Sequence, residues 1–444
     1  LKPDSFKTGG LTGPIGGSVL HIAMLSGEYP PRWGGMGSVV FHLAGALVKQ
    51  GHRVTVITRR DKSVERNPRR IPQQEGVSVL SVKWAPLPMA FTVSYGKWAL
   101  RELLRIHRKD PFDAVHVHAP MISWKEKQYQ IVRDKIGPVI TSLHGSWLGE
   151  RDGMTRAAKH GESAVWKNPN DLAILLTAKH YAKYERAAVR ASTLCVANSE
   201  ATKADFQSRY NPPENWRCEV VRWGVDTNMF VPLDCDHEDT MLAHEEMRKR
   251  YGEPDENALA GLSETETPLI LAVGRLVARK GYRTLLKAMP GVLEAYPRAH
   301  LVIVGRGHMK RTLHRQAKRL GVNESVTIES GLPFEELAQL FRSSDLVAYP
   351  SYYEGQGLIP LEAMASGTPV VTVDDGPLPE MVDETVGGLF DINHPETLSV
   401  AINELLNNHE QREVMAANGR HRVLDEYTYA LNAERYVEYY ATKD

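Results

Sequence analysis

The chain has 444 residues, zero formal net charge and a hydrophobic fraction of 42%, values typical of a globular protein of two or three domains. No apolar run approaches the ~20 residues of a membrane-spanning helix, and three cysteines without a Cys-x-x-Cys pair argue against a disulfide framework or a structural zinc site. Residues 1–225 contain 33 Lys and Arg against 19 Asp and Glu, a net charge of +14 that the acidic remainder balances. A basic first half is expected to attract an anionic acceptor, an anionic membrane surface, or the acidic second half itself.

Residues 1–17 are rich in glycine and predict a flexible lead-in without the apolar core of a signal peptide, so we expect a cytoplasmic protein. Beyond them, short β-branched runs alternate with amphipathic helical patterns such as 38–50, 281–295 and 309–320. Strands are predicted at 19–25, 52–58, 77–82, 114–118, 139–143 and 194–197, and again at 269–273, 300–304, 325–329, 346–349 and 369–373. This repeated α/β pattern predicts two Rossmann-like, doubly wound domains with parallel sheets.

A polar, acidic segment at 231–267 separates the two halves, with a helix expected at 240–251. It divides the chain into a first domain at 18–230 and a second at 268–425. The segment 426–444 follows, and it contains tyrosines at positions 427, 429, 436, 439 and 440. We interpret these tyrosines as packing side chains rather than as a stacking platform, and we expect no nucleic-acid partner.

Two loops that follow strands in the first half carry candidate site residues, because ligands of doubly wound folds bind beyond the carboxyl ends of the strands. In GEYPPRWGGMGS, Gly34 and Gly35 precede a helix, so their backbone N–H groups can approach a phosphate, although a plain turn is the alternative. The motif is not a P-loop, since no Gly-Lys-Ser/Thr follows. In TSLHGSW, His144 is expected to hydrogen-bond a substrate hydroxyl or to act as acid or base, unless it is structural.

The second half opens with LAVGRLVARKGY, in which Arg275 and Lys280 bracket the turn into a helix near Gly281. Two cations at a helix N-terminus predict a diphosphate clamp, with solvated surface charges as the alternative. The next strand ends in VIVGRGH, where Lys310 replaces the third glycine of a dinucleotide fingerprint. This incomplete match is weak evidence for NAD.

The stretch SYYEGQGLIPLEAMASGTPVV supplies two glutamates. Glu354 is predicted on the loop after strand 346–349, and Glu362 in the first turn of a helix that Pro360 begins. Carboxylates accept strong hydrogen bonds from hydroxyl groups, so Glu354 is expected to bind a sugar and Glu362 a ribose. For Glu362, compensation of the helix dipole is the alternative. A glycosidase pair would need both groups at one bond, which the helix-start position of Glu362 disfavours.

Together these motifs resemble the retaining glycosyltransferases of family four, which share the GT-B fold with glycogen synthases and sucrose-phosphate synthases. EGQGLIPLEAMASGTPVV matches a family pattern close to EGFGLxxLEAMAxGxPVV, and GRLVARKG and EYPPRWGGMG match two further family motifs. RWGVD at 222–226 resembles the family's NGVD at the interdomain junction. The resemblance covers about residues 19–390. It implies two Rossmann-like domains that face a cleft, an acceptor-side first domain, and a C-terminal helix that crosses back to it.

The resemblance also implies roles for individual residues. The donor, a nucleotide-diphosphate sugar, is expected on the second domain, with Arg275 and Lys280 on its diphosphate. Glu354 and His144 are expected at the sugar, as catalytic residues, and Glu362 at the ribose. Backbone amides of Gly34, Gly35, Gly357 and Leu358 are expected to approach phosphate or sugar. No metal and no cofactor are expected, because cations and helix dipoles stabilise the departing diphosphate.

The implied function is transfer of a hexose, glucose or mannose, from a UDP- or GDP-linked donor such as UDP-glucose or GDP-mannose, with retention at the anomeric carbon. The expected acceptor is a hydroxyl group in glycan, glycolipid or small-glycoside synthesis. Three alternatives stay open: a glucan synthase, a nucleotide-sugar epimerase, and a non-catalytic nucleotide-sugar binding protein. Arg32 replaces the lysine of the glucan synthases' Lys-x-Gly-Gly motif, which argues against a glucan synthase.

Three further features bear on donor and acceptor. Gln356 stands where the family usually has an aromatic residue, and we expect it to alter contacts with the base or the sugar. The long basic segment 148–183 is expected to shape the acceptor site. The basic amphipathic helix at 97–109 is expected to contact anionic lipid, which would make the protein peripheral on the inner face of the membrane, or else to be an ordinary solvated helix.

Overall fold

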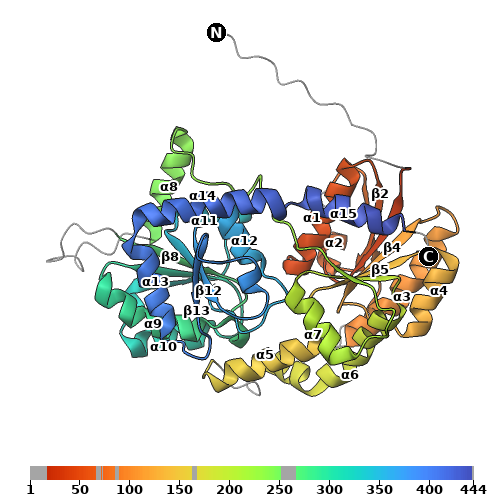
Figure 1. Ribbon diagram of the computed structural model, residues 1–444, viewed down its shortest axis with the longest axis horizontal. Helices are drawn as coiled ribbons and strands as arrows, with labels where there is room; N and C mark the ends of the chain where they lie inside the picture. The colour runs from red at the N-terminus through yellow and green to blue at the C-terminus, as the bar shows by residue number, and fades with distance from the viewer. Residues whose placement is uncertain are drawn as a thin grey trace, which may run out of the picture.

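The computed structural model describes residues 18–66, 72, 74–85, 90–162, 168–251 and 267–442. Two parallel sheets lie side by side (Figure 1), one of seven strands in the order β3-β2-β1-β4-β5-β6-β7 and one of six in the order β10-β9-β8-β11-β12-β13. The first domain contains β1 (His21–Ser26), β2 (Arg53–Arg59), β3 (Val77–Val82), β4 (Ala114–Ala119), β5 (Val139–Leu143), β6 (Leu194–Ala197) and β7 (Cys218–Val220). The second contains β8 (Leu269–Val273), β9 (His300–Val304), β10 (Val326–Glu329), β11 (Leu346–Tyr349), β12 (Val370–Val373) and β13 (Gly387–Phe390).

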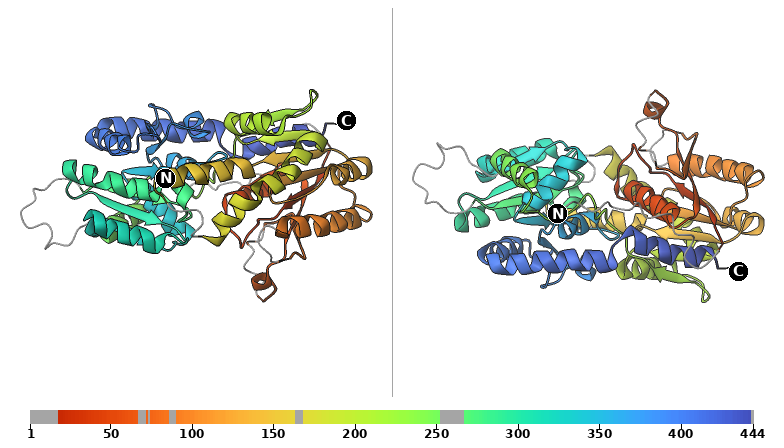
Figure 2. Two further views of the ribbon diagram at one scale, coloured as in Figure 1. Left: turned by 90° about the horizontal axis from the view of Figure 1, so that it is seen from below. Right: turned by 90° about the horizontal axis from the view of Figure 1, so that it is seen from above.

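Each sheet reverses its strand order once, between β1 and β4 in the first domain and between β8 and β11 in the second. Such a reversal opens a crevice at the carboxyl ends of the strands, where doubly wound folds bind ligands. All residues of the central strands β5 and β8 are buried, because helices cover both faces of the sheet (Figure 2).

Helices connect the strands in the pattern that the alternating sequence predicts. In the first domain they are α1 (Gly35–Lys49), α2 (Lys62–Arg66), α3 (Ala90–His107), α4 (Glu126–Lys135), α5 (Trp147–Lys159), α6 (Pro169–Ala191) and α7 (Glu200–Tyr210). The second half has α8 (Glu238–Tyr251), α9 (Tyr282–Ala295), α10 (Lys310–Leu320), α11 (Phe334–Ser343), α12 (Leu358–Ala365), α13 (Thr397–Asn407), α14 (His409–Glu426) and α15 (Tyr429–Tyr440). The described part of the second domain also contains the short 3-10 helices η4 (Ala278–Lys280), η5 (Asn323–Ser325) and η6 (Leu378–Glu380).

Helices α14 and α15 run across both domains (Figure 1). Helix α14 packs on α12, whereas α15 packs on α1 of the first domain. The buried side chains of Tyr429, Ala433 and Tyr436 belong to the hydrophobic core around β1 and α1. The tyrosines of this segment therefore pack, as predicted, and they tie the end of the second domain to the first.

Helix α5 lies at the side of the molecule opposite α14 and α15 (Figure 1) and extends from the first domain to the second. Ser146 caps its start by accepting a hydrogen bond from the Gly149 N–H group at 2.9 Å. Ala157, near its end, is fully buried in the core of the second domain. The segment 148–183, expected to shape the acceptor site, thus contributes an interdomain contact through α5.

Helix α3 contains the predicted basic helix and begins earlier, at Ala90. Its Lys97, Arg101 and Arg105 are spaced four residues apart and are exposed, so they form one basic stripe. In the part of the chain that the structure describes, no helix is both long enough and apolar enough to cross a bilayer.

Candidate active site

The predicted site residues gather where the strand ends of the two domains face each other. The Gly355 carbonyl, after β11, accepts hydrogen bonds from Ser199 Oγ at 2.7 Å and Thr202 Oγ1 at 2.9 Å, both at the start of α7. A Cβ atom added to Gly35 would lie 3.8 Å from Leu358 Cδ1. Leu358 packs against the cores of both domains. The first turn of α1 therefore lies close to the first turn of α12.

Two helix N-termini without side-chain caps meet at this point. Helix α1 starts after Gly34 and α12 after Gly357, and neither residue has a side chain that could cap the first turn. Gly357 has a φ of 107°, which side-chain-bearing residues rarely adopt, so glycine is required there. Free N–H groups and helix dipoles at both termini favour an anion, as predicted from Gly34, Gly35, Gly357 and Leu358.

Arg275 and Lys280 both follow β8, but their surroundings differ. Arg275 is exposed and, among the described residues, has no ion pair. The Lys280 side chain is only 11% exposed; its Nζ donates to Tyr349 Oη at 2.6 Å and pairs with Glu354 Oε1. Arg275 is therefore a free cation at the cleft, whereas Lys280 is a fixed one.

The N-terminus of α9 is not available to a diphosphate, contrary to the sequence-based expectation. The backbone N–H groups of Arg283 and Thr284 donate to the Glu162 carboxylate at 3.0 and 2.6 Å, and Thr284 Oγ1 donates to it at 2.7 Å. Glu162 follows α5 of the first domain and is completely buried. A carboxylate from the other domain thus occupies the position predicted for phosphate.

Glu354 lies on the loop after β11, as predicted, and is held by one of its two oxygens. Oε1 accepts hydrogen bonds from Tyr349 Oη at 2.8 Å and from Ser351 Oγ, in addition to the ion pair with Lys280. Burial opposes ionisation, but Lys280 and Arg279 outweigh it and hold the pKa of Glu354 at about 2. No residue in the described part of the chain bonds Oε2, which leaves an ionised acceptor oxygen beside the cleft.

Glu362 does not lie in the first turn of its helix. Helix α12 begins at Leu358, two residues before Pro360, so Glu362 is in the second turn and no acidic residue lies in the first. Dipole compensation therefore does not explain it. Burial raises the pKa of Glu362 to about 7, and its carboxylate has no hydrogen-bond partner among the described residues.

His144 lies beside the loop of Glu354. A Cβ atom added to Gly355 would be 2.4 Å from the His144 carbonyl oxygen, so the two backbones are in direct contact. The His144 ring lies 5.0 Å from that of Trp223 and its Nε2 atom is 2.9 Å from His118 Nδ1. The structure thus brings the predicted histidine and the predicted sugar-binding carboxylate to one place.

Two family models match adjoining parts of the chain. The model described as Glycosyltransferase Family 4 matches residues 33–229, and that described as Glycosyl transferases group 1 matches residues 255–422. Together they cover most of both domains. The chain belongs to the family-four glycosyltransferases.

Relatives agree with this family, and a solved structure agrees with the fold. An uncharacterised glycosyltransferase of Methanocaldococcus jannaschii is 28% identical, over 95% of this chain and 98% of its own length. The GDP-mannose-dependent alpha-(1-6)-phosphatidylinositol monomannoside mannosyltransferase of Mycolicibacterium smegmatis is 28% identical, over 94% and 97%. Sucrose-phosphate synthase from Thermosynechococcus elongatus has a TM-score of 0.72 at 20% identity, over 95% and 98%. The glycosyltransferase therefore has the GT-B fold that the resemblance implied.

Gln356 of the glycosyltransferase is buried beside Trp223, and its expected effect on base or sugar contacts stays a prediction. Its side chain is 1% exposed; Oε1 accepts a hydrogen bond from the Trp223 N–H group at 2.6 Å and Nε2 donates to the Trp223 carbonyl at 3.3 Å. Trp223 belongs to the interdomain junction. Gln356 therefore fastens the loop of Glu354 to that junction.

We expect Gln356→Leu to lower the free energy of unfolding by about 1–3 kcal/mol, because the buried Trp223 N–H group loses its acceptor. Urea denaturation followed by circular dichroism measures the change. Gln207→Leu, an exposed position on α7, is the matched control. Equal stability of Gln356→Leu and the control would contradict the role assigned to the amide.

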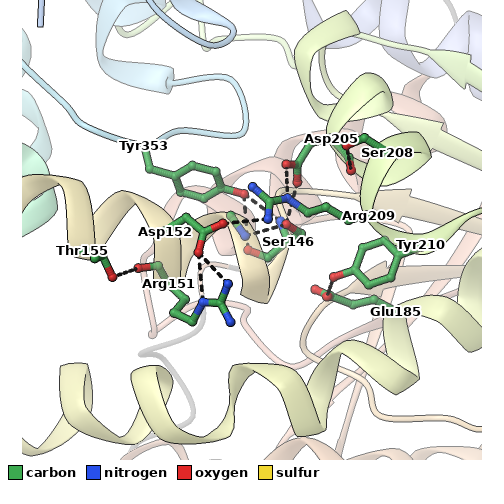
Figure 3. Close-up of polar contacts among 11 residues, drawn as sticks. Ser146, Arg151, Asp152, Thr155, Glu185, Asp205, Ser208, Arg209, Tyr210 and Tyr353 are labelled. Carbon is green, nitrogen blue, oxygen red and sulfur yellow. Dashed lines mark hydrogen bonds and ion pairs between the residues drawn. The ribbon is translucent and has the colours of Figure 1, made fainter. Parts of the chain in front are cut away.

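Tyr353 of the glycosyltransferase inserts into a notch on α5 (Figure 3). Its hydroxyl accepts from the Ser146 N–H group at 2.8 Å, and Cβ atoms on Gly149 or Gly153 would lie within 2.5 and 2.3 Å of its side chain. Only glycine fits at these two positions of α5. A cavity of about 370 Å³ adjoins the notch and is lined by residues that include Arg156, Arg209 and Glu354.

Sequence reasoning missed three residues of this region: Glu28, Glu162 and Tyr353. The Glu28 carboxylate lies beside Gly34, where a Cβ atom would be 2.7 Å from Oε2, and burial raises its pKa although Arg275 opposes the rise. A glutamate between a strand and a double glycine was the available signal for Glu28. For Glu162 and Tyr353, whose partners are more than 100 residues away, no local signal exists.

Within the described ranges, no group of three or more His, Cys, Asp and Glu side chains is arranged to hold a metal ion. Independence from metals and cofactors stays a prediction.

Proposed function

We propose that the glycosyltransferase transfers a hexose with retention from a nucleotide-diphosphate sugar to a hydroxyl group of an acceptor that carries phosphate. One observation carries the proposal: the uncapped N-termini of α1 and α12 meet across the cleft, and Arg275, which has no ion pair among the described residues, acts electrostatically on the Glu28 carboxylate beside Gly34. Two helix dipoles and a free guanidinium suit a diphosphate better than a single phosphate. Glu354 lies close enough to this site to hold the attached sugar.

The residues divide the work between binding and charge stabilisation. Arg275 and the amides of Gly34, Gly35, Gly357 and Leu358 hold the diphosphate, and Lys280 adds fixed positive charge. Glu354 Oε2 and His144 hold the sugar. The bond from the anomeric carbon to the diphosphate breaks, the acceptor oxygen bonds to the same carbon on the same face, and the acceptor proton passes to the leaving phosphate oxygen. Fixed cations and helix dipoles stabilise the departing charge without a metal ion.

The donor and acceptor follow from charge and from similarity. The similarity to a GDP-mannose-dependent phosphatidylinositol monomannoside mannosyltransferase makes GDP-mannose the first donor to test, with UDP-glucose second. The basic first domain suits a phosphorylated or lipid-linked acceptor, and the stripe of Lys97, Arg101 and Arg105 suits peripheral contact with the anionic inner face of a membrane. We also propose a cytoplasmic location, because the inner face of the membrane is the one exposed to the cytoplasm.

The test is release of UDP or GDP from a panel of nucleotide sugars, with and without phosphatidylinositol mannosides, inositol phosphate and glucans. Release that requires a phosphate-bearing acceptor supports the proposal. Conversion of the donor to a different nucleotide sugar without acceptor would indicate an epimerase, and binding without release would indicate a binding protein. Either outcome overturns transfer. The anomeric configuration of the product, read by NMR, decides retention.

Glu362 gives this function a pH dependence. Burial raises the pKa of Glu362 from the ordinary 4.5 to about 7, so the free energy of unfolding falls as pH rises between these values. The ionised form, in turn, accepts hydrogen bonds from a ribose. We expect GDP or UDP to bind about tenfold more tightly at pH 8 than at pH 6. In Glu362→Gln this gain should shrink, and the unliganded variant should melt at a higher temperature than wild type at pH 8. Calorimetric titration measures nucleotide binding, and thermal unfolding measures stability. Equal pH profiles of nucleotide binding for wild type and Glu362→Gln would contradict the ribose assignment.

A further inference from the structure

A histidine pair connects β4 to β5 beneath the cleft. His116 and His118 lie two residues apart on β4 and therefore project from the same face of the sheet. His118 is paired in register with Ser142 of β5, two residues before His144. His118 Nδ1 and His144 Nε2 are 2.9 Å apart, and the two ring planes differ by only 5°. Such near-coplanar rings align the N–H group of one with the lone pair of the other.

His116 belongs to a separate, closed network. Its Nδ1 contacts Tyr440 Oη at 2.6 Å and its Nε2 contacts Ser142 Oγ at 2.7 Å, so both ring nitrogens have partners. Ser142 Oγ is also 2.7 Å from Tyr436 Oη. The His116 ring stacks on His118 with centroids 4.1 Å apart. His116 therefore supports the ring of His118 without bonding to it.

In the pair of His118 and His144, the outer nitrogen of each ring lacks a partner among the described residues. Within the described residues, His118 Nε2 and His144 Nδ1 are buried and have no hydrogen-bond partner. Burial lowers the pKa of His118 well below its usual value, with His116 and His144 adding to the effect, and it lowers that of His144 to about 3. Each ring is therefore neutral at pH 7 and carries one proton.

Two proton arrangements are possible in a neutral pair. In one, His118 Nδ1–H donates to His144 Nε2, and His144 carries its proton on Nδ1. In the other, His144 Nε2–H donates to His118, and the proton of His118 is on Nε2, buried and without an acceptor. Once a substrate oxygen lies against His144 Nδ1, only the first arrangement satisfies every N–H group. Buried N–H groups without acceptors are rare and costly.

We propose that His118 is a positioning residue: its Nδ1–H donates to His144 Nε2 and thereby makes His144 Nδ1 the hydrogen-bond donor presented to the substrate. The inference rests on the proposed function, because it assumes that His144 meets the donor sugar. A donor directed at charge that develops during transfer accelerates the chemical step rather than binding.

Three substitutions of His118 separate positioning from packing. The amide of Asn reaches the place of Nδ1, that of Gln reaches the place of Nε2, and Leu has the size of Asn without a donor. We expect His118→Asn to keep kcat within about threefold of wild type, and His118→Leu and His118→Gln to lose about tenfold or more. KM for the donor should stay within about twofold in all three.

The kinetics are measured on the full chain with the donor and acceptor that the panel identifies. Equal kcat values for the Asn, Gln and Leu variants, whether high or low, would overturn the inference while transfer itself stands, as would a change confined to KM. If the Leu variant does not fold, the comparison of Asn with Gln decides alone. Absence of turnover by the wild-type protein would remove the proposed function, and this inference with it.

Discussion

Replacement of Lys280 by alanine is expected to lower kcat/KM for transfer by about 10²–10³-fold, the cost of removing one fixed charge that stabilises a departing anion. The substitution also removes the nearer of the two cations that pair with the Glu354 carboxylate, which is 11% exposed, and leaves only Arg279 at 4.0 Å. Loss of one partner from a buried pair destabilises a protein by about 3–5 kcal/mol. Glu354→Ala should likewise remove most activity, since the sugar loses its acceptor. Steady-state kinetics and urea denaturation measure the two effects.

A double variant separates charge from fold. Lys280→Ala combined with Glu354→Gln removes both charges, so it should recover most of the lost stability and none of the activity. Lys318→Ala, at an exposed position on α10, is the control for loss of a lysine. Activity near wild type in Lys280→Ala and in Glu354→Ala would remove both residues from the site.

Replacement of Glu162 by alanine is expected to have the second-largest effect, on the stability of α9. Three hydrogen bonds to its carboxylate disappear, and two of the donors are backbone N–H groups at the start of α9. Loss of a helix cap costs about 0.5–2 kcal/mol, and buried donors without an acceptor add to it, so we expect about 2–3 kcal/mol. Glu162→Gln keeps one acceptor oxygen and should lose less.

Hydrogen exchange followed by mass spectrometry tests this locally, since a protein of two domains need not unfold in one step. Peptides that cover the first turn of α9 should exchange faster in Glu162→Ala than in wild type. Glu294→Ala, at an exposed position on the same helix, should leave that exchange unchanged. Unchanged protection of α9 in Glu162→Ala would show that the cap is dispensable.

The sheets could be predicted from the sequence because their central strands are short runs rich in apolar and β-branched residues. Every predicted strand is present, and those at β3, β5, β6, β8, β9 and β11 have the predicted bounds. The strands β7 and β13 were not predicted. They are short, with sequences CEV and GGLF, and they lie at sheet edges where burial no longer demands β-branched residues.

The candidate site could be predicted where glycines and charges follow strands, and not where its contacts join the two domains. Local motifs predict the backbone geometry of Gly34 and Gly357 and the charge of Glu354. Glu162 and Gln356 act on partners 122 and 133 residues away, so only the folded chain reveals them. The predicted phosphate position at α9 failed for the same reason: its occupant comes from the other domain.

The placement of α15 has a consequence for biosynthesis. Tyr436 and Tyr440 hydrogen-bond to Ser142 and His116 within the first domain, and Tyr429 and Ala433 belong to that domain's core. The ribosome makes these residues only after the whole second domain. The first domain therefore lacks part of its core throughout translation of the second domain. The apolar side chains of α1 that pack against α15 are exposed until that helix emerges. A nascent chain stalled before Thr428 should bind chaperones at α1 and release them once synthesis passes α15.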